Sequence, residues 1–260
     1  MQFAFPFHRL ANYTLIVSCL FVISSSLAAQ KTDKPPREQI GVCLGKPVYR
    51  DQIRTGKYIT LQTELLRLFA SPATEKYFEA HESEIVPTEA EIAFTANYYS
   101  KDSEITELSQ NEASYARGQL VLIQQQLAST TLTEEKRKQL ELERTEFQAE
   151  LKMPGRSFAR FLLDNLKFQR HLYDNFGGGR ILWQQAGQEA FDAMHHWLKD
   201  LEKKGEFRID DPKLREVFYE YWTTDHSFLT SNPERIREEF LEPEWAPDLS
   251  AHQPLTAKKP

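Results

Sequence analysis

The chain of 260 residues contains little cysteine and no excess of positive charge. Of its two cysteines, Cys19 lies in a segment that we expect to be removed, and Cys43 alone cannot form an internal disulfide bond. The fold must therefore be stabilised by its hydrophobic core. The 32 Lys and Arg residues against 38 Asp and Glu give a formal net charge of −6. This balance argues against a nucleic-acid-binding surface, which usually carries a basic stripe.

Residues 1–28 have the pattern of a secretory signal peptide. The first 14 residues contain one Arg and no acidic residue, residues 15–23 are apolar, and small residues precede Ala28 and Ala29. Cleavage after Ala28 or Ala29 fits this pattern, so we predict an exported, periplasmic protein. The apolar run is shorter than the roughly 20 residues that span a bilayer. An uncleaved membrane anchor is the alternative.

A second form of processing is also compatible with the leader. Residues 16–19, which read Ile-Val-Ser-Cys, are similar to a lipoprotein processing box in which Cys19 would receive the lipid. The apolar run continues through this position, which favours ordinary cleavage. We therefore expect contact with a membrane only through an uncleaved signal or a lipid on Cys19.

The mature chain is predicted to be mainly α-helical. We expect a multi-helix domain with a short N-terminal β-hairpin and a protruding antiparallel helical hairpin. The hairpin is predicted from two polar segments with narrow apolar seams. After it, we expect a helix that ends at the three glycines before Arg180, and another helix over residues 181–201. The predicted regions are a flexible leader (29–39), a helical region that opens with the β-hairpin (40–104), the helical hairpin (105–152), an aromatic-rich helical region (153–242) and a flexible tail (243–260).

Two motifs resemble the N-terminal domain of SurA/PpiC/PrsA-type envelope chaperones. The first is a strand, glycine turn and helix start within residues 45–53, and the second is a helix start within residues 85–92, about 35 residues further along. In the second motif, the Thr88 hydroxyl and the Glu91 carboxylate are placed to form a reciprocal capping box. The resemblance covers about residues 40–100, and its pattern positions are Gly45, Val48, Asp51, Ile53, Thr88, Glu91 and Ile92.

The chain departs from this family in one respect. Residues 178–183 are only a faint echo of the glycine-rich segment of the family's parvulin isomerase domain, so no isomerase activity is expected. The resemblance implies a chaperone-like protein that binds unfolded or extended polypeptide through apolar helical surfaces. A structural or assembly subunit that binds an envelope protein is the first alternative, and an anion or small-ligand binding protein is the second.

The sequence also contains two candidate ligand sites, one for an anion and one for a metal. Gly177, Gly178, Gly179 and Arg180 precede a predicted helix, where exposed amides and the guanidinium favour an anion; a hinge or helix reversal is the structural alternative. Elsewhere, His195 and His196 lie near acidic residues. Adjacent helical side chains point about 100° apart, so a metal would need a distant third ligand, such as His171 or His226. We predict no catalytic constellation, no bound metal and no cofactor.

Overall fold

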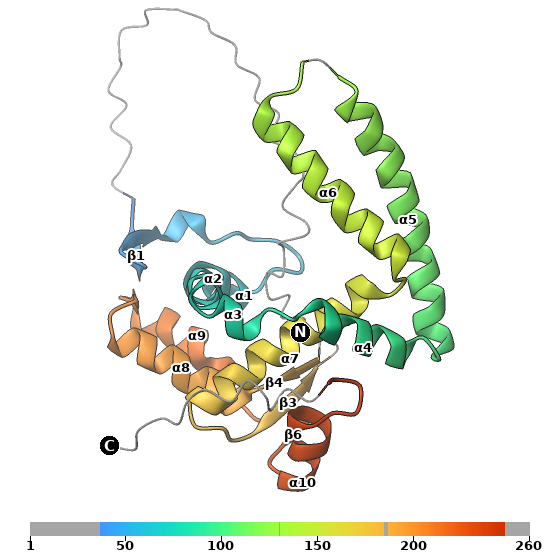
Figure 1. The fold of residues 1–260 in the computed structure, drawn as a ribbon. Helices are drawn as coiled ribbons and strands as arrows, with labels where there is room; N and C mark the ends of the chain where they lie inside the picture. The colour runs from blue at the N-terminus through green and yellow to red at the C-terminus, as the bar shows by residue number, and fades with distance from the viewer. Residues whose placement is uncertain (1–36, 130, 185–186, 248–260) are drawn as a thin grey trace, which may run out of the picture. The chain divides into compact units, whose positions relative to one another are not determined.

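The computed structural model describes residues 37–129, 131–184 and 187–247. The predicted signal peptide, Cys19, most of the leader and most of the tail lie outside these residues. The described chain is mainly helical with small antiparallel sheets, which confirms the predicted fold class at this level (Figure 1). None of the described helices combines the length and apolarity that crossing a bilayer requires.

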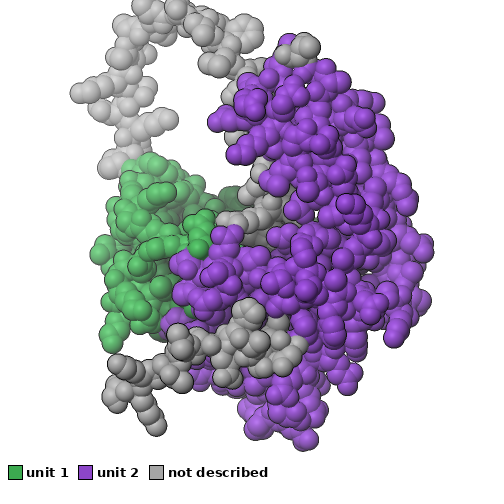
Figure 2. All heavy atoms as spheres, viewed as in Figure 1, with its two compact units in different colours: residues 1–79, 197–224 green, residues 80–196, 225–260 purple. Residues whose placement is uncertain are grey.

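The chain divides into two compact units (Figure 2). Unit 1 contains the described residues up to Glu79 together with residues 197–224. Unit 2 contains residues 80–196 and the described residues from Asp225 onward. Each unit is therefore assembled from segments that are distant in the sequence.

Unit 1 contains a three-stranded antiparallel sheet in the order β2-β1-β5. Its strands are β1 (Gln39–Cys43), β2 (Lys46–Tyr49) and β5 (Phe207–Ile209). Leu44 and Gly45 have φ values of 49° and 75° and form the two-residue turn between β1 and β2. A Cβ at Gly41 would lie 2.2 Å from the Arg208 carbonyl oxygen, so the approach of β5 to β1 requires glycine there.

The helices of unit 1 pack phenylalanine rings around this sheet. They are the 3₁₀ turn η1 (Arg50–Gln52), α1 (Leu61–Leu65), the π turn η2 (Leu66–Ala70), α2 (Ser71–Ala80) and α9 (Pro212–Thr223). The rings of Phe69, Phe207 and Phe218 lie with centroids 5.5–6.3 Å apart. Beside them, Cys43 is buried, and burial raises the pKa of its thiol to about 11, which favours the less reactive protonated thiol.

Unit 2 contains most of the helical residues. Its helices are α3 (Glu82–Ile85), α4 (Glu89–Tyr99), α5 (Ser103–Leu127), α6 (Glu134–Lys152), α7 (Arg156–Asn175), α10 (Pro233–Ile236) and the π turn η3 (Arg237–Leu241). The capping box at the start of α4 is confirmed: the Glu91 amide donates to Thr88 Oγ1, and the Thr88 amide donates to Glu91 Oε2. Figure 1 shows α5 and α6 running side by side from the connection between them.

The predicted helix over residues 181–201 is wrong in its first half. Residues after the glycines form β3 (Ile181–Gln184) and β4 (Gly187–Glu189), and α8 (Phe191–Lys203) begins only afterwards. β3 also pairs with β6 (Leu229–Thr230), giving the sheet order β4-β3-β6. The short apolar run fits a helix as well as a strand, and pairing with a distant segment decides between them.

Helix α7 carries the core of unit 2. Its apolar side chains Ala159, Leu163 and Leu166 are completely buried and pack in one cluster with residues from α4, β3, α8 and the segment around η3. Its polar side chains contact other elements: Lys167 Nζ lies 3.0 Å from Glu91 Oε1 in α4, and Asn165 donates to a carbonyl of β4. Helix α7 therefore packs against α3, α4, α6, β4 and η3 of unit 2.

Candidate functional site

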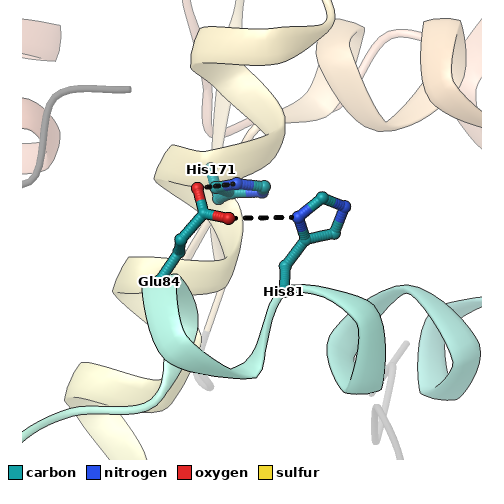
Figure 3. Close-up of side chains that lie close together, drawn as sticks. All are labelled: His81, Glu84 and His171. Carbon is teal, nitrogen blue, oxygen red and sulfur yellow. Dashed lines mark hydrogen bonds and ion pairs between the residues drawn. The ribbon is translucent and has the colours of Figure 1, made fainter. Parts of the chain in front are cut away.

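Three side chains of unit 2 meet where α3 lies against α7 (Figure 3). His81 immediately precedes α3, Glu84 lies in α3, and His171 lies in the last turns of α7. His81 Nδ1 is 3.4 Å from Glu84 Oε1, and His171 Nε2 is 3.2 Å from Glu84 Oε2. The carboxylate therefore lies between the two imidazoles, with one oxygen toward each ring. We refer to these three residues as the His-Glu-His cluster.

The cluster is open to solvent on one side. The side chains of His81 and Glu84 are 34% and 44% exposed, whereas that of His171 is only 10% exposed. Burial lowers the pKa of His171, although the bond to Glu84 opposes this effect, so the neutral imidazole is favoured. For Glu84, burial opposes ionisation, but the hydrogen bonds from the two imidazoles outweigh it and lower the pKa of the carboxyl.

Neutral imidazole nitrogens and a carboxylate are donors that zinc and related divalent metals accept. Each residue of the cluster offers one donor atom such that the three atoms lie within 4.8 Å of one another. The sequence points to His171 only as a distant third ligand beside His195 and His196, and it does not point to His81 and Glu84. Their spacing of three residues was the available signal, but the local sequence does not reveal that His171 lies opposite them.

His195 and His196, the adjacent histidines that the sequence offers as metal ligands, lie elsewhere, on α8. The rings of His195 and His196 have centroids 6.4 Å apart, and His196 Nδ1 is 3.0 Å from the Phe176 carbonyl oxygen. Their acidic neighbour Asp192 is bound to Arg180. Among the described residues, neither histidine belongs to a group of three metal-binding side chains.

The predicted anion site, residues 177–180, is next to a carboxylate of the protein itself. The Arg180 amide donates to Asp192 Oδ2 over 2.7 Å, and its guanidinium donates to Asp192 Oδ1 over 2.8 Å. Gly177, Gly178 and Gly179 all have positive φ, and a Cβ at Gly179 would lie 2.6 Å from Asp192 Oδ2. The glycines thus allow the backbone to close around Asp192, which supplies the negative charge that the motif favours.

An open pocket of unit 2 borders this arrangement. It combines the Arg180–Asp192 pair with neutral groups, and its lining residues are Tyr173, Gly179, Arg180, Asp192, Ser231, Pro233 and Ile236. Asp225 Oδ1 lies 3.6 Å from the same guanidinium. Two carboxylates therefore face one guanidinium, which disfavours an additional anion.

The family-pattern positions serve local structure. Gly45 is in the β1–β2 turn, Val48 is buried, and Asp51 pairs with Arg37 at 2.7 Å. Ile53 follows η1 and is partly buried. The remaining three positions form the start of α4: Thr88 and Glu91 in the capping box, and Ile92 in the core of unit 2.

A row of exposed apolar side chains runs along α5. Leu108, Tyr115 and Leu122 recur every seven residues, which places them on the same side of the helix. All three are exposed, and Tyr115 reaches 62%. Tyr115 makes an edge contact with Phe147 of α6, with ring centroids 6.0 Å apart. We refer to Leu108, Tyr115 and Leu122 as the α5 ridge.

Comparison of the chain with protein-family models, curated proteins and solved structures finds no match.

Proposed function

We propose that the protein is an exported, chaperone-like protein that binds extended polypeptide through apolar helical surfaces, without proline isomerase activity. The observation that carries this proposal is the α5 ridge, because exposed apolar rows on soluble proteins commonly mark interaction sites. The similarity of residues 45–53 and 85–92 to envelope chaperones also supports it. In this proposal α5 and α6 form a protruding antiparallel arm, and the ridge lies along it.

The charge of the protein limits how it would bind. With a formal net charge of −6, acidic clients would be repelled, so apolar contacts must supply the affinity. Tyr115 suits this role, because a tyrosine offers a large apolar area with few rotatable bonds. Leu108 and Leu122 extend the same surface by two helical turns on either side.

Client binding can be tested on the full chain, expressed with its own leader and purified without a tag. We expect it to suppress aggregation of an unfolded outer-membrane-type polypeptide. The double substitution Tyr115→Ser/Leu122→Ser should weaken binding about tenfold or more, because it removes the centre and one end of the ridge. Phe228→Ser is the matched control, since Phe228 is 71% exposed in unit 2 but lies outside α5.

Two results of this experiment would contradict the proposal. No suppression of aggregation by the unsubstituted protein would remove the chaperone proposal. An equal loss in the Phe228→Ser control would show that the ridge is not the binding surface. Circular dichroism of each variant establishes that the helices remain formed.

The seven-residue spacing of the ridge favours a second candidate, an assembly subunit that binds a helix of an envelope protein. Such spacing is typical of a seam that receives another helix. Crosslinking in the periplasm distinguishes this function from the first: one stable partner would indicate an assembly subunit, and many unrelated clients a chaperone.

Export is part of the proposal and has its own test. We expect the protein in the periplasmic fraction with an N-terminus at Ala29 or Gln30. A lipid-modified N-terminus at Cys19 would instead establish a lipoprotein. An intact precursor in the cytosol would contradict export.

A further inference from the structure

We propose that His81, Glu84 and His171 together bind one divalent transition-metal ion, with Zn²⁺ as the ion that best fits the donors. Zinc binds histidine nitrogen and carboxylate oxygen at about 2.0–2.2 Å, usually with tetrahedral geometry. Donors at this range lie about 3.3 Å apart in a tetrahedron. The two nitrogen–oxygen distances in the cluster, 3.4 and 3.2 Å, run to different oxygens of Glu84. One donor atom from each residue lies within 4.8 Å of the others, so small side-chain movements would bring the three to this tetrahedral separation around one ion.

The arrangement of the three side chains favours a metal over a simple ion pair. Each imidazole points one nitrogen at the same carboxylate, and one donor atom from each of the three residues lies within 4.8 Å of the others (Figure 3). One ion beside the carboxylate would therefore meet three donors.

The surroundings allow an ion to enter and remain. Glu84 and His81 are partly exposed, whereas His171 is nearly buried on α7. The cluster would supply three protein ligands and leave the exposed side for water, the arrangement of zinc sites with one open position. Zinc is preferred to calcium or magnesium, because those ions favour oxygen ligands.

Metal binding would also join two parts of unit 2. Helix α3 has only four residues, and the cluster joins it to α7, which carries the core. An ion that binds the folded arrangement and not the unfolded chain stabilises the fold. This inference is independent of polypeptide binding, and its test involves no client.

The experiment uses the tag-free full chain, stripped of metal with a chelator and then equilibrated with ZnCl₂. We expect one zinc per chain by equilibrium dialysis with elemental analysis, and a rise in Tm on zinc addition. Cobalt in place of zinc should give visible absorption bands of nitrogen–oxygen coordination. The substitutions Glu84→Gln and His171→Gln should each weaken zinc binding at least tenfold. His196→Gln is the matched control, an exposed histidine of unit 2 outside the cluster, and should leave binding unchanged.

Several results would overturn the inference. These are no zinc retained by the unsubstituted chain at micromolar concentration, equal affinity in the Glu84→Gln variant, or the same loss in the His196→Gln control. If His171→Gln impairs folding, Glu84→Gln decides, because Glu84 is partly exposed and glutamine preserves its size. Failure of this test would leave the proposed function standing.

Discussion

Helices α5 and α7 are the two longest of unit 2, but they bury very different fractions of their residues. Helix α7 buries nine of its 20 residues, including Leu163, Leu166 and Phe168. Helix α5 buries only four of its 25 residues, and of these Ser109, Ala113 and Ala116 are small. Both have apolar residues at helical spacing. Two causes act together: the apolar residues of α5 are less concentrated on one face, and α5 packs mainly against α6, whereas α7 packs against α3, α4, α6, β4 and η3.

The largest expected effect is the loss of a leucine from α7. Leu166 is completely buried in the core cluster, so Leu166→Ala should lower the free energy of unfolding by about 2–5 kcal/mol. Leu122→Ala removes the same atoms from α5, where the side chain is 49% exposed, and should cost less than about 1 kcal/mol. Urea denaturation followed by circular dichroism measures both. Equal losses would show that α5 is buried in solution.

A second prediction concerns how closely α5 approaches its neighbour. Ala116 is 1% exposed, and α6 is the principal neighbour of α5, so Ala116→Leu should overpack the interface. We expect a loss of about 1–3 kcal/mol in the free energy of unfolding. Gln125→Leu, at an exposed position of α5, is the control and should change it little. A neutral Ala116→Leu would mean that α5 and α6 separate easily.

Features that depend on neighbouring residues could be predicted from the sequence, and features that depend on distant residues could not. Helix α6 (Glu134–Lys152) lies within residues 105–152, where the spacing of polar and apolar residues predicts helix, and the capping box of α4 follows from Thr88 and Glu91. The strand β3 was not predicted, because its short apolar run fits a helix as well as a strand and part of its pairing, with residues 229–230, is non-local. The His-Glu-His cluster has the same origin, since His171 reaches Glu84 across 87 residues.

A third prediction uses a buried carboxyl on α7. Burial raises the pKa of Asp164 to about 6, although Arg160 and Lys167 oppose the effect. Between about pH 4 and 6, Asp164 keeps a proton in the folded protein that it has released in the unfolded chain, where its pKa is near 3.9. The free energy of unfolding therefore falls as pH rises through this range. Asp164→Asn removes this loss and should stabilise the protein by about 1–3 kcal/mol at pH 7.

The pH dependence distinguishes this effect from better packing. The gain of Asp164→Asn should grow between about pH 4 and 6, level off above pH 6 and vanish below pH 4. Asp225→Asn, at a side chain that is 97% exposed, should show no such dependence. Urea denaturation at several pH values measures the difference, and a gain that is constant with pH would contradict the assignment.

The smallest effect is expected for the corresponding carboxyl on α5. Burial raises the pKa of Glu112, nearby Glu150 adds to the shift, and Glu112 Oε2 is buried without a hydrogen-bond partner. Glu112→Gln removes the charge and should raise the free energy of unfolding at pH 7 by about 0.5–1 kcal/mol. The raised pKa means that this gain should disappear as pH falls below the ordinary value near 4.3. Glu107→Gln, at an exposed position of α5, is the control. A gain as large as that of Asp164→Asn would show that α5 is as desolvated as α7, and the distinction between the two helices would fail.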